Sequence, residues 1–105
     1  MEDKRLILLV CSSGMSTSML MREMQKAADG QGLPFVISSA GTAGIEDEIR
    51  RADAILLAPQ VRHRFESFSE MAREAGKPIQ IVPPEIYGRL DGQKALEMAS
   101  KMMGL

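Results

Sequence analysis

Four short apolar runs are spaced along the chain. They are LILLV (6–10), PFVISS (34–39), DAILLAP (53–59) and IQIVP (79–83). Runs rich in Leu, Ile and Val and bounded by Gly, Pro or Asp are typical of strands that are buried on both faces of a parallel sheet. The pattern therefore predicts four strands at these positions.

Each apolar run is followed by a stretch in which apolar residues recur at helical spacing. These stretches are 18–32, 44–52, 62–78 and 91–105, and several end at Gly or at Gly and Pro. Such spacing and such stop signals predict four helices, each with one face toward the core. The side chains expected on those faces are Met19, Leu20, Met24, Ala27 and Ala28, then Ile45 and Ile49, then Phe65, Phe68, Met71, Ala72 and Ala75, and finally Ala95, Leu96, Ala99 and Met102.

A strand-helix order repeated four times predicts an α/β fold. The sheet is expected to be parallel with helices on both faces, because parallel neighbours need crossover connections. The flavodoxin-like strand order 2-1-3-4 is the natural arrangement, giving a three-layer sandwich formed by a single domain, residues 1–105. In such sheets ligands bind at the carboxyl ends of the strands where the winding direction changes, between the first and third strands. Cys11 directly follows the first strand and is expected at this point.

Composition narrows the function classes. The chain has 105 residues, with 13 Lys and Arg against 14 Asp and Glu, so a net charge of −1 gives no reason to expect nucleic acid or an anionic membrane as a partner. No apolar run approaches the length of about 20 residues that spans a bilayer, and MEDKR at the start does not resemble a signal peptide. A single Cys excludes an internal disulfide and a multi-cysteine metal cluster. We therefore expect a cytoplasmic protein without metal or cofactor.

The cysteine is followed by small residues and hydroxyls, in the order CSSGMSTS (11–18). A loop of this composition at a helix start can turn several backbone N–H groups toward one point, which makes an anion site. The same donors would favour the thiolate form of the cysteine. The pattern thus predicts Cys11 as a nucleophile that accepts a phosphoryl group. The predicted phosphate cradle comprises Ser12, Ser13, Gly14, Met15, Ser16 and Thr17. The simpler alternative is a packed structural thiol followed by serine caps.

The loop resembles the phosphate-binding loop of low-molecular-weight tyrosine phosphatases, which carry C-x5-R-[S/T]. In this chain Thr17 stands where those enzymes have the arginine, and no Asp-Pro dipeptide is present to supply their general acid. An arginine at that position forks onto two phosphate oxygens and stabilises the transition state of hydrolysis. Hydrolysis is therefore a weaker hypothesis than phosphoryl transfer.

Three segments together resemble the IIB component of the bacterial sugar phosphotransferase system, of the lactose/cellobiose/chitobiose type. They are CSSGMSTS (11–18), ADAILLAPQVR (52–62) and YGRLDG (87–92). The resemblance implies that Cys11 takes a phosphoryl group from a phosphohistidine of the IIA component. It also implies that the group passes to a sugar bound by the membrane IIC component. For such a relay a shallow, exposed loop would let both partners reach the thiol in turn, and we expect the chain to be a monomer.

Several other residues near the expected site have two interpretations. Gln60 either contacts the cysteine loop or a partner, or simply ends the third strand. His63, flanked by Arg62 and Arg64, is expected to face solvent rather than act as a base, although the arginines can also attract a phosphorylated partner. Tyr87 and Asp91 are expected in the loop after the fourth strand, with Asp91 as the N-cap of the last helix.

Two other functions remain as alternatives. A small phosphatase would release phosphate steadily from aryl phosphates. A non-catalytic interaction module of the receiver type would need acidic residues at the end of the first strand to hold Mg²⁺, and this chain has its first acids before that strand.

Overall fold

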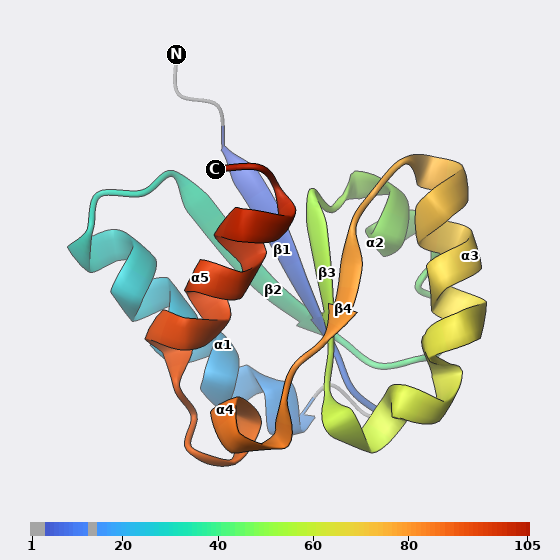
Figure 1. Cartoon of the computed structure of the whole chain (residues 1–105), viewed down its shortest axis with the longest axis horizontal. Helices are drawn as coiled ribbons and strands as arrows, with labels where there is room; N and C mark the ends of the chain where they lie inside the picture. Colours follow the sequence, from blue (N-terminus) through green and yellow to red (C-terminus); the bar gives the residue numbers. More distant parts are fainter. Residues whose placement is uncertain (1–3, 13–14) are drawn as a thin grey trace.

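The computed structural model describes residues 4–12 and 15–105, and of Met15 and Ser16 only the backbone (Figure 1). Strands and helices alternate along the chain, as predicted. The elements are β1 (Arg5–Val10), α1 (Met15–Gly30), β2 (Phe35–Ala40), α2 (Glu46–Arg51), β3 (Ala54–Leu57), the 3-10 helix η1 (Pro59–Arg64), α3 (Phe65–Ala75), β4 (Ile79–Ile81), α4 (Pro84–Gly88) and α5 (Gly92–Met102).

The four strands form one parallel sheet in the order β2-β1-β3-β4. In Figure 1, α1 and α5 cover one face of this sheet, whereas α2 and α3 cover the other. The predicted fold class and strand order are therefore confirmed. Within the central strand, Val10 lies opposite Ala40 of β2 and Leu57 of β3, so the carboxyl ends of three strands meet at one edge.

The core lies on both faces of the two central strands. Every residue of β3, and the last four residues of β1, are buried. The helical residues predicted to face the core are also buried at ten positions: Leu20, Met24, Ala28, Ile45, Ile49, Phe68, Ala72, Ala95, Leu96 and Ala99. Ala27, Phe65, Met71 and Met102 pack partly buried against them, and Ala75 is half-buried.

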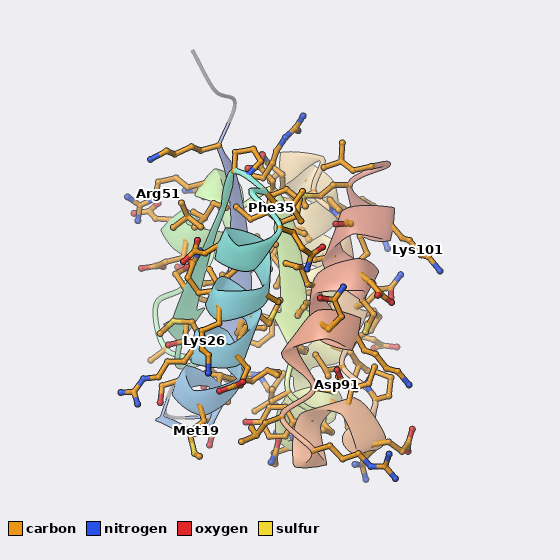
Figure 2. All side chains as sticks on the ribbon, turned by 90° about the vertical axis from the view of Figure 1, so that its left-hand side faces the viewer. Met19, Lys26, Phe35, Arg51, Asp91 and Lys101 are labelled. Atoms are coloured by element: carbon orange, nitrogen blue, oxygen red, sulfur yellow. The ribbon has the colours of Figure 1, made fainter. Side chains whose placement is uncertain are left out.

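Met19 is an exception, because the prediction that it faces the core is wrong. Its side chain is 56% exposed. The buried stripe of α1 runs through Thr17, Leu20, Met24 and Ala28. Since successive helical residues are rotated by roughly 100°, Met19 lies on the outer side of that stripe. Figure 2 shows it near the lower end of α1.

Two helical elements differ from the prediction. The segment expected to be one helix over 62–78 is divided into η1 and α3, with Val61 at non-helical angles (φ −113°, ψ 21°) and Pro59 at the start of η1. The segment around Tyr87, expected to be a loop, forms the short helix α4, which begins at Pro84. In both cases a proline shortly after the end of a strand starts a helical turn, because its fixed φ suits the first position of a helix.

The edge strand β2 is tied to α1 by one glutamine. The Gln25 side-chain oxygen accepts a hydrogen bond from the Ile37 N–H at 2.9 Å. The Gln25 Nε2 group donates to the Phe35 carbonyl, also at 2.9 Å. The side-chain amide thus takes the place of a neighbouring strand and satisfies backbone groups that an open edge would leave exposed.

Helices α1 and α5 touch most closely at Gly92, the first residue of α5. A Cβ atom built there would lie 2.4 Å from the Glu23 carbonyl carbon of α1. The same turn is closed by Asp91, whose Oδ1 accepts a hydrogen bond from the Lys94 N–H at 3.1 Å, so the predicted N-cap is confirmed. Gly92 is therefore required by contact with a neighbouring backbone.

The variant Gly92→Ala tests this contact. We expect it to lower the free energy of unfolding by about 1–3 kcal/mol, the usual cost of overpacking, because the opposing atoms belong to helix backbone and cannot rotate away. Urea denaturation followed by circular dichroism measures the change. Gly30→Ala, at the end of α1 where nothing lies within 4 Å, is the matched control and should be neutral or slightly stabilising. Equal stability of the two variants would show that the helix contact does not require glycine.

Candidate functional site

Backbone hydrogen bonds fix Cys11 at the end of the central strand. The Cys11 N–H donates to the Ala40 carbonyl at 3.1 Å, just beyond the last residue pair of β1 and β2. On the other side, the Ala58 N–H donates to the Val10 carbonyl at 2.8 Å. The thiol thus lies at the carboxyl edge of the sheet, between the ends of β2 and β3, where the sequence places it.

Helix α1 supplies a hydrogen-bond donor to the thiol. The Thr17 hydroxyl donates a hydrogen bond to Cys11 Sγ, with an O···S distance of 3.6 Å. Both residues are 1% exposed. A hydrogen bond to sulfur favours the thiolate, whereas burial of the sulfur disfavours any charge on it, so the hydroxyl offsets part of the cost of burial. Sequence analysis gave Thr17 a role toward phosphate oxygens but missed this direct contact, which follows from the six-residue separation and the helix start between the two residues.

The Cys11 side chain is buried, and most of the loop that the sequence predicts to be shallow and exposed lies outside the described residues. Cys11 ends a buried strand, and the side chain of Thr17 lies against it from α1. The next residue, Ser12, is exposed. The exposed surface therefore begins at the residue after Cys11.

Helix α1 begins at Met15, shortly after Cys11 in the sequence, and no acidic residue lies in its first turn. Unpaired backbone N–H groups and the helix dipole make such an end favourable for an anion. Of the predicted cradle, Ser13 and Gly14 lie outside the described residues, and Met15 and Ser16 contribute only their backbone to this description.

The structure places the other residues for which the sequence left two interpretations. Gln60 and His63 are exposed on η1, together with Arg62 and Arg64. His63 faces solvent, as predicted. Tyr87 lies on α4 rather than in a loop, and only 8% of its surface is exposed, so it belongs to the core.

The described part of the chain has no group of three or more His, Cys, Asp or Glu side chains that could hold a metal ion. Within the same residues, no helix has both the length and the apolar character needed to cross a bilayer.

Comparison with known proteins shows similarity along nearly the whole chain. The family model "PTS system, Lactose/Cellobiose specific IIB subunit" matches residues 6–98. The cellobiose-specific EIIB component of Lactococcus lactis is 36% identical, with 98% of this chain and 99% of that protein covered. The oligo-beta-mannoside-specific EIIB component of Bacillus subtilis is 35% identical, with 92% and 94% covered.

A solved structure shows the same similarity in three dimensions. It is the solution structure of the cellobiose-specific phosphotransferase IIB component from Borrelia burgdorferi. The TM-score is 0.83 at 33% identity, and 99% of this chain and 95% of that chain are covered. The likeness therefore extends to the whole architecture.

The variant Thr17→Val tests the contact with the thiol. It keeps the shape of the side chain and removes the donor, so we expect the fraction of Cys11 thiolate at neutral pH to fall by roughly threefold to tenfold. Because the chain has one cysteine, ultraviolet absorbance of the thiolate during a pH titration reports this group directly.

Thr17→Ser is the matched control, since it keeps the hydroxyl. It should retain the wild-type titration. A Thr17→Val titration that coincides with the wild type would show that the hydroxyl does not stabilise the thiolate.

Proposed function

Because the chain belongs to the lactose/cellobiose-specific IIB family of the phosphotransferase system, we propose that it carries a phosphoryl group on Cys11. In this proposal residues 1–105 act as one phosphotransferase domain at the cytoplasmic side of the membrane. The observation that carries it is the hydrogen bond from the Thr17 hydroxyl to Cys11 Sγ, beside the amino end of α1. A thiol that only packs in a core needs no such donor.

The proposed reaction has two steps. First, the Cys11 thiolate attacks the phosphorus of a phosphohistidine on the IIA component, so that an S–P bond forms and the N–P bond breaks. Then a hydroxyl of the sugar held by the membrane IIC component attacks the same phosphorus, and the thiolate leaves. The chain supplies position and charge stabilisation, which dominate phosphoryl transfer.

The predicted phosphate cradle keeps its roles in this proposal. Thr17 and the backbone amides at the start of α1 hold the phosphate oxygens, together with Ser12. Ser13, Gly14, Met15 and Ser16 complete the loop, as the sequence pattern predicts. All these donors are neutral, so they bind the dianion without the strong activation that a guanidinium gives.

The neutral donors of the cradle also favour transfer of the phosphoryl group over its hydrolysis. Thr17 occupies the position that an arginine holds in the phosphatase loop, and it contacts sulfur. The single histidine of the chain, His63, is exposed on η1. We expect a phosphoryl group on sulfur to wait for the second partner, because no guanidinium at position 17 stabilises the transition state of hydrolysis.

Burial of the thiol sets a condition for this reaction. At 1% exposure, Cys11 Sγ cannot be approached in line with a departing histidine. Transfer therefore requires side chains around the sulfur to move when a partner docks, a common response at signalling and relay interfaces.

The sugar is chosen by the partner in this proposal. Relatives named for cellobiose and for oligo-beta-mannosides resemble the chain to nearly the same degree, 36% and 35%. The chain consequently serves a sugar of the cellobiose, lactose or chitobiose class, held by IIC, and acts as a monomer between the two components.

The variant Cys11→Ser tests the nucleophile. It should fold like the wild type, because the change is nearly isosteric, and gain no phosphate from phosphorylated IIA. Intact mass after incubation with phosphorylated IIA measures this, with Ser67→Ala, at an exposed position of α3, as the control that keeps the thiol and the cradle. A Cys11→Ser protein labelled as fully as the wild type would place the phosphate on another residue.

Aryl-phosphate turnover by the same preparations tests the rival activity. We expect no steady release of phosphate from the wild type. Turnover without labelling of Cys11 by IIA would instead make the chain a small phosphatase.

A further inference from the structure

Two arginines, Arg62 and Arg64, lie on η1, the helix that follows the strand next to Cys11 in the sheet. The Ala58 N–H is bonded to the Val10 carbonyl beside Cys11, and η1 starts at the next residue, Pro59. Arg62 and Arg64 are in the last turn of η1, and both are exposed. In Figure 1 this helix and the start of α1 lie at the same end of the molecule. The two cations therefore border the edge that carries the nucleophile.

These charges are not neutralised within the described residues. The ion pairs found there join Lys26 to Glu23, Arg50 to Asp47 and Lys77 to Asp53. Neither arginine of η1 takes part in them. The Arg64 guanidinium instead lies 4.9 Å from the centre of the Phe68 ring, which holds its stem against α3 and leaves its charge available.

The nearest acidic side chain does not cancel the pair. Glu66, in the first turn of α3, lines a hollow on that helix together with Phe65, Ser69, Glu70 and Arg73. The whole chain carries a net charge of −1. The helix η1 itself carries both arginines and no acidic residue, so its charge is positive although that of the whole chain is negative.

An exposed apolar side chain at the same end favours a protein as the binding partner. Met19 is 56% exposed near the lower end of α1, far from Arg51 at the upper end (Figure 2). Protein interfaces combine an apolar contact with a charged rim, and flexible Met side chains adapt well to a partner surface. A free small anion would use the charges but not the methionine.

We propose that Arg62 and Arg64 form a cationic rim that attracts the phosphorylated donor protein to the edge carrying Cys11. This inference rests on the proposed function, since it names how the donor of that reaction is captured. The donor presents a phosphohistidine and hence negative charge, and cations beside the acceptor raise the rate of encounter. The arginines act on association and do not touch the phosphorus during transfer.

The test compares two double variants with the same change of charge. Arg62→Gln/Arg64→Gln removes the rim, and Arg51→Gln/Arg73→Gln removes two exposed arginines from α2 and α3. Both variants change the net charge by −2, from −1 to −3. Rapid-quench kinetics with phosphorylated IIA give the second-order rate constant and the maximal rate at saturation, from about 0.02 M to about 0.5 M salt.

We expect the rim variant to lose roughly threefold to tenfold in the second-order rate constant at low salt, and to match the wild type at high salt. Its maximal rate should be unchanged, and the control variant should follow the wild type throughout. Equal slowing of both variants would assign the effect to net charge and overturn the rim. The rim proposal would also be overturned if the rim variant kept the wild-type second-order rate constant at low salt, or if its maximal rate fell.

The premise is checked in the same experiment. If the wild type gains no phosphate on Cys11, the proposed function fails and the rim with it. If Cys11 is phosphorylated at equal rates in all proteins and at all salt concentrations, the carrier function stands and only the rim is refuted.

Discussion

The hydrogen-bond ladder that holds β1 between β2 and β3 determines the position of every feature of the site. It continues one step beyond the strand pairs, through the bonds of Cys11 to Ala40 and of Ala58 to Val10. A slip of one residue would turn Cys11 to the opposite face of the sheet and exchange the side chains that pack against the helices on the two faces. The loss of core packing that such a slip would cause keeps the thiol beside the start of α1. Packing of the core therefore also fixes the geometry of the site.

The surroundings of the thiol suit the proposed carrier function. Its described neighbour is a neutral hydroxyl, and both groups are buried. A neutral donor stabilises a thiolate or a bound phosphoryl group without making hydrolysis fast, and burial keeps water away until a partner arrives. In the proposed relay these two properties serve the same end, because the phosphoryl group must survive the interval between two encounters.

Much of the fold was predictable because it depends on local pattern. The four strands, their order and the inward faces of the helices follow from runs of buried residues and from helical spacing. Met19 was placed wrongly because an apolar residue beside a buried stripe has no sequence signal for the direction of its side chain. The division of 62–78 and the helix at Tyr87 were missed because a proline after a strand can begin either a loop or a helical turn.

The sequence by itself determined the fold class and the position of Cys11 at the carboxyl edge of the sheet, because these depend on periodicity and on residue type. Only the tertiary structure decided that the thiol is buried, that Thr17 donates to it, and that Gln25 closes the edge of the sheet. It also decided that Gly92 must lack a side chain. Each of these depends on distances between elements that the chain brings together only when it folds, and residue order carries no measure of such distances.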